Sequence, residues 1–218
     1  MVIPTLDAAA SLERTVAALG DAAGEILVAD GGSRDDTTGI ARRLGLRIVR
    51  SGPGRGVQLA AGAEAASGTW LLFLHADTML SVGWTDAVTT YQRRPDAGDR
   101  AAAFRLAFDD PSPAARRVER LANWRARRLG LPYGDQGLLL SRRLYDAVGG
   151  FRPLPLMEDV DLVRRIGRGR IELLPATATT SAARYHHDGW WLRPARNLMC
   201  LALWYLGTPP RIVRRLYG

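Results

Sequence analysis

The chain has 218 residues, nearly half of them hydrophobic, which is enough for one domain with a sizeable core. Its formal net charge is +8 and it contains no lysine, so arginine supplies the basic surface, which suits nucleic acid, anionic lipid or a phosphate-bearing substrate. The single cysteine, Cys200, excludes an internal disulfide and a cysteine metal cluster. No apolar run approaches the ~20 residues that span a bilayer, and no signal-peptide pattern opens the chain, so we expect a cytoplasmic protein that can rest on the inner face of the cell membrane.

Strands and helices alternate through the first half of the chain. Apolar patterning predicts strands over residues 2–4, 25–29, 46–49 and 69–74. Helices are predicted over residues 8–19, from a Ser33 cap to about residue 44, and over 57–66, closed by Gly68. Each connection is long enough for the next strand to return parallel to the last. The sequence therefore predicts an α/β fold with a Rossmann-like, mainly parallel sheet and helices on both faces.

Polar side chains follow these strands. They are Thr5, Asp7, Asp30, Arg55 and Asp77. The carboxyl ends of parallel strands share one edge of a sheet, where open α/β folds place their ligand crevice. We therefore expect these side chains to converge on one site.

The stretch 69–78, TWLLFLHADT, combines a buried strand with a candidate metal ligand. Its apolar run has no polar face, which is typical of a central strand covered on both sides, and it stops at His75 and Asp77. Asp77 either caps the following helix or holds Mg²⁺ or Mn²⁺, a cation often bound by one or two carboxylates together with substrate phosphates. Such an ion would neutralise a diphosphate leaving group.

Two glycine-rich turns in the first half could approach a ligand. Asp30, in Asp30-Gly31-Gly32, either forms the turn or accepts hydrogen bonds from a base or ribose. Arg55, in the loop 51–56, is a plausible phosphate contact. The glycine spacing of that loop is not a dinucleotide fingerprint, and no phosphate-loop lysine motif or Gly-x-Ser-x-Gly elbow occurs.

The second half has a different pattern. We expect a helix over residues 84–91, a strand over 101–108, a basic helix over 114–129, a loop over 131–136 and a strand over 137–140. A helix capped by Ser141 and ending at Gly149-Gly150 follows, then a helix over 158–166, extended segments over 171–174 and 176–183, and an apolar helix over 194–206.

Two pairs of adjacent side chains carry the candidate chemistry of the second half. Glu158 and Asp159 either favour the helix N-terminus or include a general base, and only one of the two can face a given substrate atom. His186 and His187 are either a surface pair or a late metal ligand.

Taken together, these motifs resemble the nucleotide-sugar-dependent glycosyltransferases of family 2, which have the GT-A fold. The resemblance spans about residues 2–166, and the matching pieces occur in the family's order: Val2-Ile3-Pro4-Thr5-Leu6, Val28-Ala29-Asp30-Gly31-Gly32-Ser33 with Asp35-Asp36-Thr37, the segment 55–62, Leu72-Phe73-Leu74-His75-Ala76-Asp77-Thr78 and Met157-Glu158-Asp159. Three segments resemble a narrower branch, the radical-SAM/selenodomain-associated transferases: Gly134-Asp135-Gln136, Phe108-Asp109-Asp110-Pro111 and Leu154-Pro155-Leu156-Met157-Glu158-Asp159. The resemblance to this branch extends to the C-terminal region, residues 180–217.

The resemblance implies a role for each matching residue. Pro4, Thr5 and Asp7 would line the nucleotide pocket, and Asp30 with Gly31 would meet the uracil or ribose. Asp77 would be the second acid of the Asp-x-Asp metal motif, with His187 as a late ligand, while Asp159, beside Glu158, would be the base of an inverting transfer. The remaining nucleotide-sugar contacts would come from Arg55, His75, Ala76, Gly134, Asp135 and Gln136.

Two departures from the family pattern affect the donor site. His75 stands where the first acid of Asp-x-Asp usually stands, and Asp7-Ala8 replaces the usual Asn-Glu. The Gln-x-x-Arg-Trp motif of processive synthases is absent, which favours a single transfer.

The sequence thus predicts a metal-dependent, inverting glycosyltransferase that uses Mg²⁺ or Mn²⁺ and a UDP-sugar. The acceptor would offer a hydroxyl or carboxyl group, with lipid-like or carotenoid compounds as one class. We expect a single domain, 1–218, with a nucleotide-sugar half (1–108), an acceptor half (109–190) and a helical tail (191–218). Trp190, Trp191, Trp204 and Tyr205, interleaved with arginines, suit the headgroup region of a membrane.

Two alternatives stay open. A sugar-phosphate nucleotidyltransferase shares the architecture but needs a glycine-rich basic signature after the first strand, where this chain has Leu6-Asp7-Ala8-Ala9. A non-enzymatic nucleic-acid-binding module would use the arginines of 114–129, although no nucleic-acid motif surrounds them and we expect no nucleic-acid partner.

Overall fold

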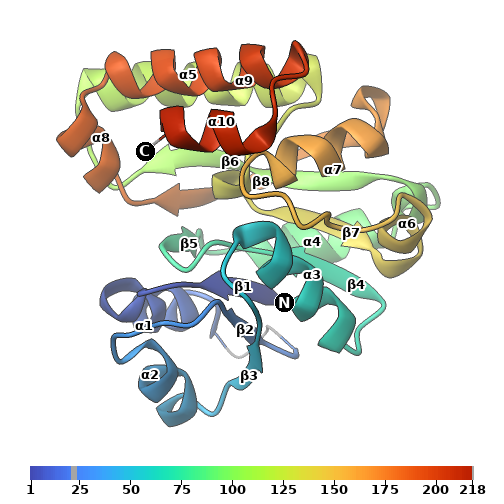
Figure 1. The fold of residues 1–218 in the computed structure, drawn as a ribbon. Helices are drawn as coiled ribbons and strands as arrows, with labels where there is room; N and C mark the ends of the chain where they lie inside the picture. Colours follow the sequence, from blue (N-terminus) through green and yellow to red (C-terminus); the bar gives the residue numbers. More distant parts are fainter. Residues whose placement is uncertain (21–23, 218) are drawn as a thin grey trace.

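A computed structural model describes residues 1–20 and 24–217. Its described residues form one eight-stranded sheet in the order β3-β2-β1-β4-β7-β6-β8-β5 (Figure 1). The strands are β1 (Val2–Thr5), β2 (Leu27–Asp30), β3 (Arg47–Arg50), β4 (Trp70–Phe73), β5 (Thr78–Leu80), β6 (Ala101–Phe108), β7 (Leu138–Ser141) and β8 (Ile171–Thr180). The helices are α1 (Ala9–Ala17), α2 (Thr37–Arg43), α3 (Arg55–Ala65), α4 (Trp84–Gln92), α5 (Pro113–Leu129), α6 (Arg142–Ala147), α7 (Glu158–Ile166), α8 (Ala183–Asp188), α9 (Leu192–Tyr205) and α10 (Pro210–Tyr217).

The first half of the sheet is parallel, as the crossover lengths predict. β3, β2, β1 and β4 lie in this order and all run the same way. β4 is the central apolar strand, and its side chains alternate between two cores. Leu71 and Phe73 pack with α3 on one face, while Leu72 joins α1, α2 and α4 on the other. Burial on both faces explains why the run has no polar side.

The second half makes the sheet mixed. β7 pairs antiparallel with β4 and with β6, β6 pairs parallel with β8, and the short β5 returns antiparallel against β8. The predicted α/β class, with helices on both faces, is therefore confirmed, and the parallel arrangement holds for the first four strands. Helices α9 and α10 add a further layer beside α5 and α7, at the top of Figure 1.

Several expected boundaries differ because tertiary contacts decide them. Ser33 does not cap α2: its hydroxyl bonds to Asp30, and α2 begins only after Asp36. Gly68 does not close α3, which ends where Ala66 becomes extended. The Ser141 cap is confirmed, since its Oγ accepts from Leu144 N at 3.0 Å. Asp77 is followed by β5 rather than by a helix, so it is not a helix cap.

The extended segments predicted over residues 171–183 form one strand, β8, which ends at Thr180 and is followed by α8. The apolar tail helix is confirmed as α9, and a separate α10 follows it to Tyr217. Over residues 1–20 and 24–217, no helix combines the length and the apolar character that crossing a membrane requires.

Candidate active site

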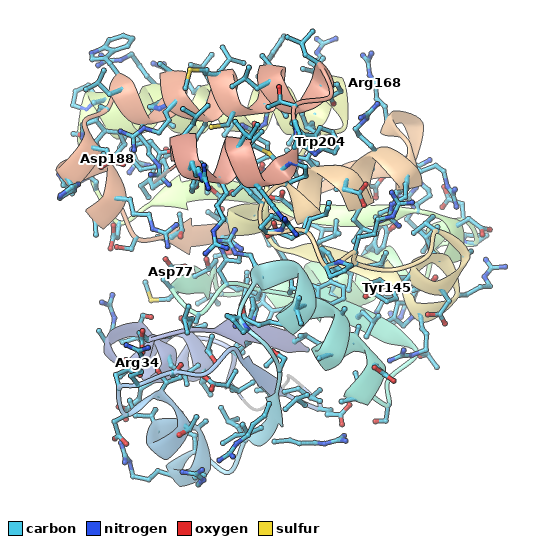
Figure 2. The ribbon with its side chains drawn as sticks, viewed as in Figure 1. Arg34, Asp77, Tyr145, Arg168, Asp188 and Trp204 are labelled. Carbon is cyan, nitrogen blue, oxygen red and sulfur yellow. The ribbon has the colours of Figure 1, made fainter. Side chains whose placement is uncertain are left out.

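A cavity of about 810 Å³, open mouth included, lies between the carboxyl ends of the first strands and the C-terminal helices. Figure 2 shows Asp77 between these two parts of the molecule. Four carboxylates line the cavity: Asp77 after β4, Asp135 before β7, and Glu158 and Asp159 at the start of α7.

Asp159 is held rigidly at the cavity wall. Its Oδ2 accepts a hydrogen bond from the backbone N–H of Gly134 at 2.8 Å, and its Oδ1 accepts one from the N–H of Val160 at 2.7 Å. It occupies the first turn of α7, where the helix dipole favours a negative charge. Met157, the residue directly before α7, has a left-handed backbone (φ 64°), which turns the chain sharply into the helix. A carboxylate fixed in this way can accept a proton from a bound group.

Gly134 brings His75 and Asp159 together. A Cβ built on Gly134 would lie 2.5 Å from His75 Nε2 and 3.6 Å from Asp159 Oδ2. Only a residue without a side chain therefore fits between the end of β4 and the start of α7. This contact joins the two halves of the chain at the site.

His75 is neutral at the cavity wall. Burial, reinforced by the positive charges of Arg55 and Arg184, holds the pKa of its imidazole well below 6.5. A neutral imidazole offers one donor and one acceptor, unlike the acid of an Asp-x-Asp motif.

Two of the other three carboxylates, Asp135 and Glu158, hold protons more tightly than usual. Burial raises the pKa of Asp135 to about 6, with Asp159 and Asp77 adding to the shift and Arg125 opposing it. Burial and Asp159 raise the pKa of Glu158 to about 7, against Arg55. Within the described residues, Oδ1 of Asp135 is buried without a hydrogen-bond partner. This concentration of carboxylates favours a cationic or hydroxyl-bearing ligand.

Arginines balance part of this negative charge. Arg55, in the first turn of α3, lies 3.4 Å from the fully buried Glu158. Arg184 on α8 is exposed, lines the same cavity, and has no ion pair to any carboxylate in the described part of the chain. The cavity therefore presents both carboxylates and a guanidinium to a ligand.

The strand ends of β1 and β2 form a separate, self-contained network. Asp30 accepts hydrogen bonds from the N–H groups of Gly32 and Ser33 and from the hydroxyls of Thr5 and Ser33. Burial would raise the pKa of Asp30, but these hydrogen bonds outweigh it and lower that pKa. Asp7 Oδ1 accepts from Arg34 N at 2.7 Å. These carboxylates hold the two loops together, and Thr5, Asp7, Asp30 and Gly31 do not line the cavity.

The side chains of two expected site residues lie outside the cavity lining. Gln136 is fully buried and its amide donates to Phe104 O at 3.1 Å, so its side chain supports the loop and does not reach the cavity. His187 is 88% exposed and pairs with Asp188 at 2.7 Å, away from Asp77, so it is not placed as a metal ligand. A local motif does not show which way a side chain points, so the binding role of Gln136 and the metal-ligand role of His187 stay predictions.

Pro4 and Ala76 are buried and do not line the cavity. Pro4 lies inside β1. Ala76 packs in the hydrophobic core, and its carbonyl accepts a hydrogen bond from Thr15 Oγ1 at 2.7 Å. The two residues belong to the fold around the site and not to the cavity lining.

The basic helix α5 also contributes to the structure. Arg125 places its guanidinium 3.4 Å from the centre of the Tyr133 ring and donates from Nε to Leu131 O at 2.9 Å. Arg116 pairs with Glu119 at 2.8 Å. Arg125 and Arg116 therefore make contacts within the fold.

Comparison with known proteins identifies the family. The sequence model described as "Glycosyl transferase family 2" matches residues 1–154, more than two thirds of the chain. This chain belongs to glycosyl transferase family 2. No curated protein sequence matches it.

Solved structures share the fold of this family 2 chain. Glucosyl-3-phosphoglycerate synthase from Mycobacterium tuberculosis, solved with Mn²⁺, UDP and glucosyl-3-phosphoglycerate, is 20% identical with a TM-score of 0.62, over 95% of this chain and 79% of that one. Staphylococcus aureus TarS (1–349), solved with UDP-GlcNAc, is 15% identical with a TM-score of 0.62, over 82% and 57%. GalNAc-T7, solved with UDP, GalNAc and Mn²⁺, is 14% identical with a TM-score of 0.62, over 83% and 43%. The GT-A fold is confirmed.

The family match ends at residue 154, before the Glu158-Asp159 pair. The cavity of this family 2 chain nevertheless includes that pair and several residues of the C-terminal helices. Sequence reasoning missed Arg184, Tyr185, Arg193, Asn197 and Tyr217, which line the cavity. The resemblance over residues 180–217 assigned none of them a role, because only the packing of α8, α9 and α10 brings them to the site.

Proposed function

We propose that this family 2 chain is an inverting, metal-dependent glycosyltransferase that moves a sugar from a UDP-sugar to an acceptor hydroxyl or carboxyl group. One observation carries the proposal: Asp159, fixed by the Gly134 N–H, lines the same cavity as Asp77, which follows the central strand. Asp159, the candidate base, and Asp77, the candidate cation ligand, thus line one cavity although they come from opposite halves of the chain. The UDP-bound relatives of the same fold support the choice of donor.

The residues fit a divalent cation that shares its coordination with a ligand. Within residues 1–20 and 24–217, no group of three or more histidine, cysteine or acidic side chains could hold a metal by itself. Asp77, with Asp135 and its unpartnered buried oxygen nearby, fits the usual arrangement in which one or two carboxylates and substrate phosphates bind Mg²⁺ or Mn²⁺. When bound, the cation would supply charge neutralisation for the departing diphosphate.

The chain's own residues account for the proton and the leaving-group charge. Asp159 takes the proton of the acceptor hydroxyl as that oxygen forms a bond to the anomeric carbon. The bond from this carbon to the diphosphate oxygen breaks on the opposite face, which inverts the configuration. An acceptor carboxylate would need no base. Arg55 and Arg184 stabilise the negative diphosphate, and Glu158 positions Arg55 through their 3.4 Å ion pair.

The acceptor is the least constrained partner. We propose a lipid-like acceptor, because the cavity is lined by Phe108, Tyr133, Leu156, Met157 and Tyr185 in addition to its charged groups. This lining suits a compound with an apolar portion, and the exposed tryptophan of the C-terminal tail is consistent with cytoplasmic work at a membrane surface.

The test separates donor use from acceptor use. UDP release from UDP-glucose and UDP-GlcNAc is measured with Mn²⁺, without acceptor and then with candidate lipid acceptors. We expect Asp159→Asn to bind UDP normally but to lose acceptor-dependent transfer to a hydroxyl by roughly 100-fold or more. Asp77→Asn should remove the Mn²⁺-dependent part of UDP binding. Near-wild-type transfer by Asp159→Asn would remove its role as base, and failure of UDP with Mn²⁺ to raise the thermal midpoint would contradict the proposed donor.

A further inference from the structure

The C-terminal layer exposes an apolar surface that the fold does not use. Along α9, the exposed positions recur at helical spacing and are all apolar: Trp191 just before the helix, then Leu192, Ala195, Leu198, Met199, Ala202, Tyr205 and Leu206 just after it. Trp191 is 75% exposed and Leu206 is 82% exposed. We call these residues the α9 stripe. Globular proteins rarely leave a continuous apolar stripe of this kind open to water without a partner.

The stripe is not needed for packing. The opposite side of α9 already buries Cys200 and Leu201 in the main core, where α10 adds Val213. Two of the aromatic residues expected at a membrane face inward instead: Trp190 stacks on Tyr185, and Trp204 is half-buried with Arg164 over its ring. The helix is therefore held by one face, and its other face is available.

Arginines border the stripe on both sides. Arg117 of α5 lies 5.2 Å from the Trp191 ring, which places α5 along one border, and α10 packs against α9 along another. The layer forms the top of the molecule in Figure 1, and in Figure 2 Asp188 and Trp204 mark its two ends. The exposed arginines of the bordering helices are Arg116, Arg117, Arg120, Arg127, Arg128, Arg211, Arg214 and Arg215.

The charges on this surface have one sign. Neither α9 nor α10 contains an acidic residue, and the one acid of α5, Glu119, is buried and bonded to Arg116. Leu121 and Trp124 on α5, and Ile212 and Leu216 on α10, are also exposed among these arginines. An apolar strip bordered by cations and aromatic rings has the chemistry of a helix surface that lies in a lipid headgroup region.

We propose that the surface formed by the α9 stripe and the arginines of α5 and α10 docks on an anionic lipid bilayer. A second copy of the chain fits less well, because a symmetric contact between two stripes would bring rows of arginine against rows of arginine. Nucleic acid would satisfy the arginines but leave the apolar stripe without a partner. The bilayer satisfies both.

Docking would place the candidate site close to the membrane. Arg193 and Asn197, on the inner side of α9, line the cavity, as does Tyr217 of α10. One helix thus separates the cavity from the proposed lipid surface. The inference does not rest on glycosyl transfer, since vesicle binding needs neither donor nor acceptor.

The experiment is flotation of the full chain with vesicles of phosphatidylcholine alone or mixed with phosphatidylglycerol, at low and high salt. We expect the wild type to float only with the anionic vesicles and to bind less at high salt. Leu198→Glu with Leu206→Glu should weaken binding by roughly 100-fold, about tenfold for each apolar anchor lost. Val82→Glu is the matched control, because Val82 is a fully exposed apolar residue near the start of α4, outside this surface, and it should leave binding unchanged.

A second set of variants tests the charges. Replacing Arg211, Arg214 and Arg215 by glutamine should weaken anionic-vesicle binding roughly 100-fold, whereas the same change at Arg42, Arg43 and Arg93 should not. Circular dichroism and the thermal midpoint show whether each variant folds. If the stripe variant fails to fold, quenching of wild-type fluorescence by brominated lipid, compared with Trp191→Phe and Trp70→Phe, decides the question: only the first change should reduce quenching.

Three results would overturn the proposal. The wild type could fail to bind anionic vesicles at low salt. Its binding could be unaffected by the stripe variant, which would mean electrostatic adsorption alone. Sedimentation could show a dimer that the stripe variant dissociates while vesicles have no effect on it, which would assign the surface to a second copy.

Discussion

Substitution of Gly134 by alanine tests the contact that joins the two halves of the site. The new Cβ would lie 2.5 Å from His75 Nε2, and the backbone of Gly134 has no positive φ, so the effect is purely steric. To reach the 3.4 Å of an ordinary contact, the imidazole or the loop must move by about 0.9 Å. That movement also strains the 2.8 Å hydrogen bond from Gly134 N to Asp159.

The expected effects differ in size for stability and activity. Overpacking of this kind costs about 1–3 kcal/mol, which lowers the thermal midpoint of a domain of this size by roughly 2–12 °C. A displacement close to 1 Å between a catalytic group and its substrate costs roughly 100-fold in rate. Gly134→Ala should therefore remain folded and bind UDP, while the rate of sugar transfer falls about 100-fold in steady-state assays of UDP release.

Gly169→Ala is the matched control, because a Cβ at this position meets no atom within 4 Å. This substitution should change the free energy of unfolding by less than about 0.5 kcal/mol. In the double variant Gly134→Ala, His75→Ala, removal of the ring should recover the stability lost through the clash. A Gly134→Ala protein with normal transfer rate and normal midpoint would refute the view that this contact sets the position of Asp159.

Three further predictions follow from single contacts. The pKa of Glu158 is raised from 4.5 to about 7, so the folded state binds its proton more tightly than the unfolded state does. The stability that this adds, about 3 kcal/mol, is complete below pH 4.5 and is lost as the pH rises through 7. Urea midpoints between pH 5 and 8 should therefore decline less steeply in Glu158→Gln than in the wild type, and equal slopes would contradict the assignment. Arg184→Gln should weaken UDP binding roughly tenfold in calorimetry. The thermal midpoint should stay unchanged, because the side chain of Arg184 is exposed. Arg42→Gln is the control, and an equal loss of UDP binding in both variants would point to long-range charge alone. Gln58→Leu should lower the free energy of unfolding in urea by about 1–3 kcal/mol, because the buried amide donates to Ala29 O at 3.1 Å and to Thr5 O. The control, Gln92→Leu, should be near neutral. A Gln58→Leu protein of wild-type stability would show that these carbonyls find other partners.

The first half of the fold was predictable because its signals are local. Each strand from β1 to β4 is a short apolar run followed by a turn, and each connection is long enough for a parallel return. The short β5 was missed because three residues carry no periodic pattern, and pairing with β8, about 100 residues later, is what makes them a strand.

The site was predictable in part for the same reason. Asp77 and Asp159 were found from the ends of their elements, and the structure brings both to one cavity. Gln136 and His187 were chosen from motif position alone, and their side chains point into the core and into solvent. Gln58 was missed because a polar residue in an alanine-rich helix gives no sign of which carbonyls it will meet.

The amino-acid sequence by itself determined the α/β class, the order of the strand-end motifs and the family, because these depend on apolar periodicity and on residues close together in the chain. Only the tertiary structure decided which of the polar residues share a cavity, that Gly134 must lack a side chain beside His75, and that Arg184 lines the same cavity as the carboxylates. It also decided which tryptophans of the tail are buried and which are exposed. The physical reason is that side-chain direction, burial and charge pairing are set by contacts between segments far apart in the chain, and no local pattern encodes them.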